Sequence, residues 1–292
     1  MPERSFATRS TRRRHLPDAL ATGLVWSLAA VVAGVFTWLL GDLIRHGVGT
    51  LDGSFLTGAP RSAGREGGIG PIIVSTGLIL LVCMLVALPV GVGAAVLLAE
   101  FSSGKSVFGR LVRRSLDVLA SVPSIVFGLF GNALFCVYLG LGFSILSGGL
   151  TLACMVLPIL IRSTEVGFRS VPDEYRRAAA ALGMSRTSTL IHLLLPAAAP
   201  GLLVGLVLGV GRALAETAAL IFTSGYVDRM PTSLFDSGRS LSIHIFDLSM
   251  NVAGGDSRAY ASALVLIAMM LIINALASWI SDRRLGRRIL TV

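Results

Sequence analysis

Long segments without a charged residue dominate the pattern of polar and apolar positions along this chain. Ala19–Gly41, Ile72–Ala99, Val118–Ile161 and Ala259–Ile280 contain 23, 28, 44 and 22 consecutive residues without Asp, Glu, Lys or Arg. A helix needs about 20 residues to cross the ~30 Å hydrocarbon core of a bilayer. Each segment is therefore long enough to span a membrane as a helix.

The longest segment must contain two spans, because 44 residues greatly exceed the length of one. We place the break at a cluster of glycines, Gly140, Gly142, Gly148 and Gly149. A further apolar segment, Ala197–Phe222, is interrupted only by Arg212 and Glu216. The pattern therefore predicts an all-α, polytopic membrane protein in which residues 19–282 form six transmembrane helices.

Composition supports this class. Hydrophobic residues make up 54% of the chain and charged residues only 14%, and the mean hydropathy is +0.80. The net charge of +9 would indicate nucleic-acid binding in a polar chain. Here we attribute it to basic loops that face anionic membrane lipid, and we expect no nucleic-acid partner. The three cysteines lie in apolar segments without the spacing of a metal site, so no metal is expected.

Basic residues are distributed unequally between the predicted loops. If the N-terminus is cytoplasmic, 18 Lys and Arg residues fall in cytoplasmic segments and 6 on the opposite side, the bias that cytoplasmic loops carry. The sequence therefore predicts that both termini are cytoplasmic, with basic tails at residues 1–18 and 283–292. The first span exceeds the ~7–15 residues of a secretory signal core, so we interpret it as an uncleaved signal-anchor.

The segment between the fourth and fifth spans, about residues 165–196, is predicted to form a cytoplasmic helical hairpin. Ser170 and Asp173 fit a capping box, with Pro172 in the first turn. Glu174–Leu182 then contains four alanines, the best helix formers. These features predict the first helix of the hairpin.

The second helix of the hairpin is predicted from its boundaries. Gly183 ends the first helix, Ser185 caps the second, and the second helix, Arg186–Leu195, is expected to end at Pro196. The hairpin either connects two spans or receives a partner, and its length and spacing favour a partner.

Within the hairpin, Ala178-Ala179, Gly183 and Leu195-Pro196 have the spacing of the pattern E-A-A-x3-G-x9-I-x-L-P. This segment resembles the ATPase-coupling loop of permease subunits in ATP-binding-cassette (ABC) importers. Arg177 stands where that family has its acidic residue, and Glu174, one turn earlier, is the carboxylate that could replace it. The resemblance assigns the coupling loop to Glu174, Arg177, Ala178, Ala179, Gly183, Leu195 and Pro196.

Four further stretches are similar to those of phosphate-importer permeases, a subgroup of the same family. They are Val122–Gly131, Leu157–Glu165, Arg169–Pro172 and Gly211–Ala218. The resemblance covers about residues 20–282 and implies the MetI-like permease architecture in a bacterial cytoplasmic (inner) membrane.

The resemblance also implies a function. The chain would form half of the pathway of an ATP-driven importer of inorganic phosphate, beside a second permease subunit, with an extracytoplasmic phosphate-binding protein. Its hairpin would lie in a groove of a cytoplasmic ATPase, present as a dimer, which would rock the spans. ATP would be hydrolysed on that partner, so this chain is not expected to be an enzyme or to bind a cofactor. Two alternatives stay open: an importer for another oxyanion such as sulfate or molybdate, and a secondary transporter or channel.

Arg212 and Glu216 are candidate substrate-pathway residues. An Arg near the bilayer centre costs roughly 2.5–3.5 kcal/mol and therefore faces a cavity or a partner. Glu216 follows at i+4, so we expect the two to form an ion pair on one helix face. The guanidinium could contact phosphate, or the pair could be structural. Small residues at Gly201, Gly205 and Gly209 predict that another helix packs closely on this span.

Two weaker signals complete the set. Arg162, at the end of the fourth span, joins the pathway candidates only through the resemblance, since snorkelling to the membrane surface explains it. Residues 99–106 nearly match a nucleotide P-loop, but they leave a transmembrane helix instead of joining a strand to a helix. We therefore expect no ATP binding by this chain.

Overall fold

The computed structural model describes residues 15–102 and 106–289. Residues 1–14 and 290–292 of the predicted tails, and 103–105 of the P-loop-like stretch, lie outside the described residues. The chain divides into two units at His46–Gly47. In the first unit, α1 (His15–Gly47) contains the predicted first span.

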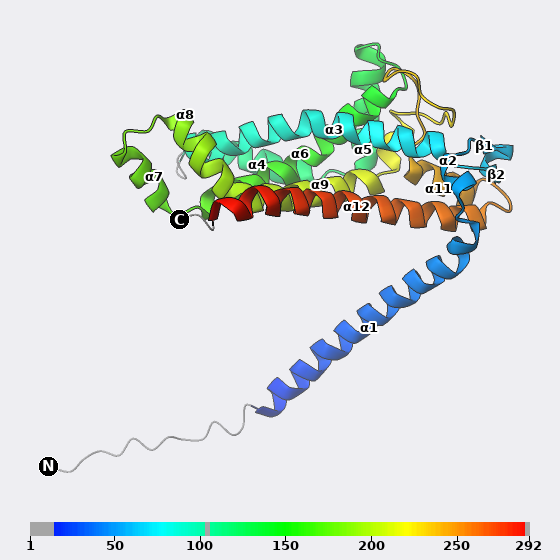
Figure 1. Cartoon of the computed structure of the whole chain (residues 1–292), viewed down its shortest axis with the longest axis horizontal. Coiled ribbons are helices and arrows are strands. Elements are labelled where there is room, and N and C mark those ends of the chain that lie inside the picture. Colours follow the sequence, from blue (N-terminus) through cyan, green and yellow to red (C-terminus); the bar gives the residue numbers. More distant parts are fainter. Residues whose placement is uncertain (1–14, 103–105, 290–292) are drawn as a thin grey trace. The chain divides into compact units, whose positions relative to one another are not determined.

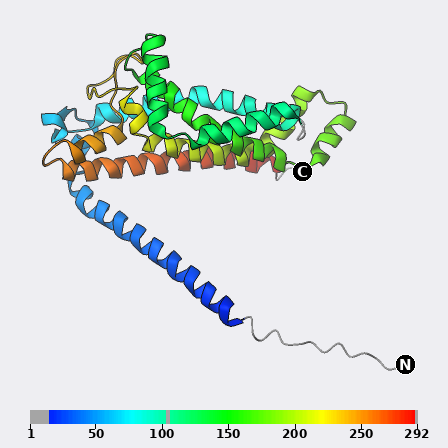
Figure 2. The ribbon, with the colours of Figure 1, turned by 180° about the vertical axis from the view of Figure 1, so that it is seen from behind.

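In the second unit, four long helices pack along one another (Figures 1 and 2). They are α3 (Gly70–Val96), α6 (Ile145–Ser170), α9 (Leu195–Ala215) and α12 (Asp256–Ile289). The main apolar core lies between α3 and α6, where Cys83, Ala87, Val156 and Leu160 are fully buried. α12 continues through most of the predicted C-terminal tail.

Glycines allow α9 to approach α6 closely. A Cβ added to Gly201 would collide with the backbone of Gly167 in α6, and one added to Gly209 would lie 2.7 Å from a methyl group of Val156. The close helix packing predicted from the small residues of this span is confirmed, and the partner helix is α6.

The third predicted span is broken into two parts at Val122–Pro123. α4 (Val107–Ser121) is followed by α5 (Ser124–Gly131) and the π-helical η4 (Asn132–Tyr138), and the two parts are bent by 100°. Between them Val122 and Pro123 are extended, with ψ of 130° and 141°. Proline disfavours helical geometry in the residue before it, which explains the break.

The direction of the helices shows that this broken segment still crosses the bundle once. Gly149 of α6 lies against Val82 of α3, and further along both helices Leu160 lies against Gly91. α3 and α6 therefore run in the same direction, so the chain must return between them through α4, α5 and η4. With five continuous candidate spans and this bent pair, the described residues contain six candidate spans, the number predicted.

The predicted break at the glycine cluster is confirmed in part. Gly140 and Gly142 have φ of +70° and +62° in the loop before α6. Left-handed backbone of this kind favours glycine. Gly148 and Gly149, in contrast, lie inside α6.

The hairpin lies at the end of the bundle where α6 ends and α9 begins, which we call the hairpin end. It contains α7 (Asp173–Ala181), α8 (Arg186–Thr189) and the π-helical η5 (Leu190–Leu194). A second π-helical turn, η3 (Leu97–Phe101), extends α3 beside it.

At the opposite end lie short elements that connect the long helices. They are η1 (Val48–Thr50), α2 (Gly53–Thr57), η2 (Ser62–Gly64), α10 (Ala218–Ile221) and α11 (Leu241–Met250), with the strands β1 (Pro60–Arg61) and β2 (Glu66–Gly67). The strands pair antiparallel, with Pro60 opposite Gly67.

The capping box predicted at Ser170 is wrong. Ser170 is the last residue of α6, its hydroxyl donates to the Gly167 carbonyl at 2.8 Å, and Pro172 occupies the cap position of α7. The predicted end of the first hairpin helix at Gly183 and the predicted cap of the second at Ser185 are confirmed. Gly183 has φ of +69°, and the Ser185 hydroxyl accepts from the Ser188 N–H at 3.2 Å.

The helix does not end at Pro196, contrary to expectation. It runs without interruption over Arg186–Ala215. In the π turn before the proline, the Leu195 N–H donates to the Leu190 carbonyl, five residues back. This wider turn relieves the clash that a proline ring otherwise makes with the preceding turn.

Candidate functional site

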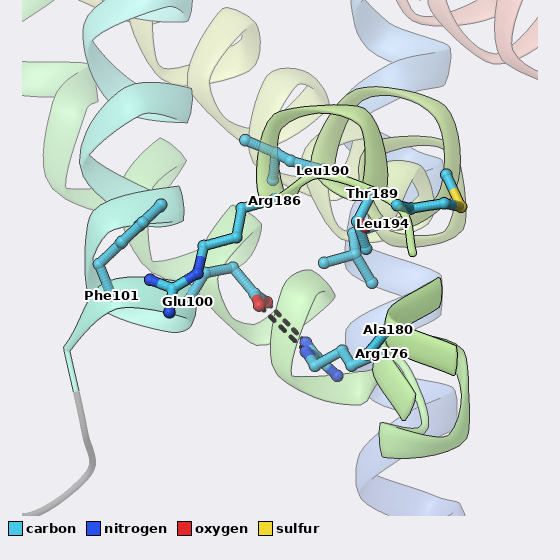
Figure 3. Close-up of a pocket in the computed structure, with 9 residues that line it drawn as sticks. Glu100, Phe101, Arg176, Ala180, Arg186, Thr189, Leu190 and Leu194 are labelled. Carbon is cyan, nitrogen blue, oxygen red and sulfur yellow. Dashed lines mark hydrogen bonds and ion pairs between the residues drawn. The ribbon is translucent and has the colours of Figure 1, made fainter. Parts of the chain in front are cut away.

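Arg176 of α7 connects the hairpin to η3 and to the end of α6. Its guanidinium donates to both carboxylate oxygens of Glu100, at 2.6 and 3.0 Å, and to the carbonyls of Phe168 and Val171, at 3.0 and 2.9 Å. Hydrogen bonding to Glu100 raises the pKa of Arg176 above its usual value. The pair joins the end of α3 to α7, as Figure 3 shows.

Two hollows flank α7. One, of about 290 Å³, lies between η3 and the hairpin, and its walls include Glu100, Phe101, Arg186 and Leu194 (Figure 3). The other, of about 320 Å³, is lined by Glu174, Tyr175, Ala178, Ala179, Leu182, Met184 and Leu193. The second hollow thus brings together three residues of the predicted coupling loop on a mainly apolar surface.

The remaining coupling-loop residues are distributed around this surface. Arg177 is exposed and makes no hydrogen bond or ion pair with another described residue. Gly183 has open space around it. Leu195 and Pro196 lie in the first turn of α9. The structure therefore assembles part of the predicted loop and leaves its arginine facing outward.

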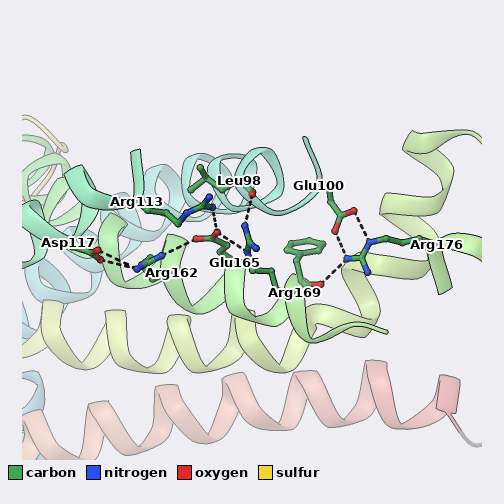
Figure 4. Close-up of polar contacts among 9 residues, drawn as sticks. Leu98, Glu100, Arg113, Asp117, Arg162, Glu165, Arg169 and Arg176 are labelled. Carbon is green, nitrogen blue, oxygen red and sulfur yellow. Dashed lines mark hydrogen bonds and ion pairs between the residues drawn. The ribbon is translucent and has the colours of Figure 1, made fainter. Parts of the chain in front are cut away.

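A second polar network surrounds Glu165 in α6 (Figure 4). This side chain is only 2% exposed, and its carboxylate accepts from Arg113 at 2.7 Å, Arg169 at 3.0 Å and Arg162 at 3.4 Å. Arg169 also donates to the Leu98 carbonyl at 3.2 Å. One buried carboxylate thus connects α4, α6 and, through Arg169, the end of α3.

The structure places Arg162 in this network. Besides Glu165, it pairs with Asp117 of α4 at 3.1 Å, and both of these side chains are substantially exposed, at 42% and 58%. Arg162 is therefore held at the hairpin end of the bundle, far along α6 from its first turn. It forms no hydrogen bond or ion pair with Arg212.

Arg212 lies in the last turn of α9. Its Nε atom is buried and has no hydrogen-bond partner among the described residues. The guanidinium therefore retains a donor that no other described residue satisfies. Buried polar atoms are normally paired, and an unpaired one calls for an explanation.

The predicted ion pair between Arg212 and Glu216 is wrong. α9 ends at Ala215, and Glu216 has extended backbone, with φ of −76° and ψ of 126°. The i+4 register is therefore lost. The Glu216 carboxylate instead accepts from the Ala219 N–H at 3.1 Å, and its carbonyl accepts from the Ser242 hydroxyl at 2.6 Å.

In the part of the chain that the structure describes, no group of three or more His, Cys, Asp or Glu residues could hold a metal ion. Two features remain as candidates for function. One is Arg212, with its unsatisfied Nε donor. The other is the hairpin, which has a partly apolar surface and is held by the ion pair of Arg176 with Glu100.

A family model described as "Binding-protein-dependent transport system inner membrane component" matches residues 87–289. The chain belongs to this family. The match includes the broken third span, the hairpin and Arg212, which are thus parts of a transport-system membrane component. The predicted permease family and all-α, multi-span fold are confirmed.

Individual relatives agree with this membership. The chain is 33% identical over 282 residues to a probable ABC transporter permease, YqgI of Bacillus subtilis, covering 91% of the chain and 96% of the relative. It is 33% identical over 260 residues to the phosphate transport system permease PstA of Yersinia pestis, covering 87% of each. For PstA 2 of Mycobacterium tuberculosis, the identity is 32% over 289 residues, covering 97% and 93%.

A solved structure supports the fold. The inward-facing MetNI methionine ABC transporter aligns with a TM-score of 0.54 over 74% of this chain and 95% of the matched chain, at 17% identity. The MetI-like architecture that the resemblance implied is therefore confirmed for this family member.

Sequence reasoning missed most of the polar residues at the hairpin end. Glu100, Arg113, Glu165 and Arg176 were not among its candidates, although all four form close ion pairs. One signal was available: Arg162, Glu165 and Arg169 are spaced i, i+3, i+7, which places them on one face of a helix. Their partner in α4 lies 52 residues away from Glu165 and had no such signal.

Proposed function

We propose that this permease is a subunit of an ATP-driven importer of inorganic phosphate and forms half of its translocation pathway. The observation that carries the proposal is the similarity, over most of both chains, to relatives named phosphate transport system permeases. Arg212 is chemically suited to this substrate, because an unsatisfied guanidinium donor matches a tetrahedral oxyanion. Glu216 follows directly after the same helix, and we assign both residues to the pathway.

In this proposal, ATP hydrolysis and substrate transport take place on different subunits. ATP would be hydrolysed on a separate cytoplasmic ATPase, two copies of which act with this chain and a second permease subunit. The hairpin would dock on that ATPase through the apolar hollow beside Ala178 and Ala179, since small side chains allow close approach of a partner helix. An extracytoplasmic phosphate-binding protein would deliver substrate at the opposite end.

Docking of the hairpin on a cytoplasmic partner requires that the hairpin end faces the cytoplasm. The six passages then place both termini on the cytoplasmic side. The excess of basic residues in the segments assigned to that side supports this orientation.

The test is co-expression of the chain with its candidate partner subunits, purification through a tag on this chain, and reconstitution into liposomes. We expect the ATPase to co-purify and phosphate uptake to require ATP and the binding protein. Competition by sulfate or molybdate with equal potency would instead assign the chain to another oxyanion. Accumulation of phosphate by liposomes that contain this chain alone, driven by an ion gradient, would overturn the proposal.

A further inference from the structure

Few side chains of α4 contact the rest of the bundle. Leu116 is the buried large apolar side chain of α4, and it packs with Leu98 and Ile161 in a small cluster. At its other end α4 meets the extended pair Val122–Pro123, where the chain turns by 100°. The orientation of α4 relative to α6 therefore depends on few contacts.

The strongest of these contacts is the ion pair between Arg113 and Glu165, at 2.7 Å. Arg113 is 16% exposed and Glu165 2% exposed, so the pair interacts in an environment of low dielectric and is screened little by salt. The second polar link of α4, from Asp117 to Arg162, is much more exposed and contributes less.

On its other side, the same carboxylate is linked to the hairpin. Arg169 joins Glu165 to the Leu98 carbonyl. Two carbonyls at the end of α6 and the Glu100 carboxylate then hold Arg176 of α7. Figure 4 shows these two groups of contacts, which the backbone of η3 and of the end of α6 joins to each other.

We propose that Arg113 is a positioning residue that transmits displacement of the hairpin to α4, so that the third span bends at Val122–Pro123 when the hairpin moves. The inference rests on the proposed function, because it presupposes that an ATPase displaces the hairpin. The hairpin, the end of α6, η3 and α4 move as one body, and the extended pair is the joint between this body and α5.

Removing Arg113 separates this role from a purely structural one. In Arg113→Gln, Glu165 keeps Arg169 and Arg162, so no buried carboxylate is left without a cation. We expect the ATPase to co-purify and to hydrolyse ATP at close to the normal rate. The phosphate transported per ATP hydrolysed should fall roughly tenfold, a typical coupling effect, and Arg113→Lys should restore much of it.

The matched control is Arg114→Gln, which removes an exposed arginine from the next position of the same helix and should leave the ratio unchanged. An unchanged ratio in Arg113→Gln, or an equal fall in Arg114→Gln, would overturn the inference. Absence of ATP-driven uptake by the unmutated complex would instead refute the proposed function.

A second measurement does not depend on the folding of a variant that lacks Arg113. Spin labels at residues 114 and 187 report the distance between α4 and the hairpin, and labels at 114 and 129 report the joint between α4 and α5. When ATP is added to the reconstituted complex, we expect the first distance to stay constant and the second to change. A change in the first distance with a constant second one would contradict the inference.

Discussion

The two ends of the bundle treat buried charge in opposite ways. At the hairpin end, the buried carboxylate of Glu165 receives three arginines, and Glu100 and Arg176 satisfy each other. At the end of α9, the Nε atom of Arg212 is buried without a hydrogen-bond partner among the described residues, and the Glu216 carboxylate accepts from one backbone N–H, that of Ala219. The difference separates charges that hold elements together from a charge that is left available.

The energetic consequences differ accordingly. Breaking a buried ion pair leaves an uncompensated charge and costs stability, so the hairpin end should respond to mutation through docking and coupling. A guanidinium with an unsatisfied donor in a span already bears part of its desolvation cost. Removing it should therefore leave folding intact and affect only what the donor binds.

The largest expected effect is on transport, from Arg212→Ala. Loss of a charged hydrogen-bond donor to phosphate should lower uptake by roughly 100-fold, while membrane insertion and ATPase co-purification stay normal. Arg212→Lys keeps the charge but loses the planar fork and should be intermediate. The measurement is phosphate uptake by reconstituted complex, and normal uptake by Arg212→Ala would exclude a role in the pathway.

At the hairpin end, Arg176→Gln should act on partner binding. Loss of the close, largely buried pair with Glu100 should release α7 from η3 and weaken ATPase binding by about 30-fold, equivalent to about 2 kcal/mol. The measurement is the Kd for the isolated ATPase on the solubilised permease. Asp173→Asn, which removes a partner of Arg176 that is 83% exposed, is the control and should bind nearly normally. Equal affinity in Arg176→Gln would mean that the pair does not position the hairpin.

The contrast between the two ends also explains what could be predicted from the sequence. Span lengths follow from the thickness of the bilayer, so uncharged segments located the membrane helices and their number. Pro123, a proline within an uncharged segment, indicates a kink but not its angle, so only the extent of the bend could not be predicted. Hydropathy carries no information on a break that leaves composition unchanged.

The same distinction applies to the candidate sites: features with local sequence signals were predicted, and contacts that depend on tertiary packing were not. The hairpin was found because its signals are local: a left-handed Gly183 and a cap at Ser185. The pairing of Arg212 with Glu216 failed because i+4 spacing implies contact only while the helix continues, and α9 ends between them. The link from Arg113 to Glu165 joins positions 52 residues apart, and tertiary packing alone brings them together.

A smaller effect is expected from the turn of the hairpin. Gly183→Ala places a side chain at φ of +69°, which costs about 1–2 kcal/mol. If the turn holds the coupling surface in shape, ATPase binding should weaken by about tenfold. Asn tolerates left-handed backbone better, so Gly183→Asn should bind more tightly than Gly183→Ala. Co-purification of the ATPase with both variants at normal yield would count against a docking role of the hairpin.

The smallest effects compare two serines near the ends of the hairpin. The Ser185 hydroxyl accepts from an N–H in the first turn of α8, which has no partner within the helix. The Ser170 hydroxyl instead donates to the Gly167 carbonyl in the last turn of α6 and caps no N–H of α7. Ser185→Ala should therefore destabilise the hairpin by about 1 kcal/mol, and Ser170→Ala by less than about 0.5 kcal/mol. Hydrogen exchange of the α7 and α8 amides in the purified complex measures the difference. Faster exchange of α7 in Ser170→Ala than of α8 in Ser185→Ala would restore the capping box at Ser170 and would place the start of the hairpin two residues earlier than the structure does.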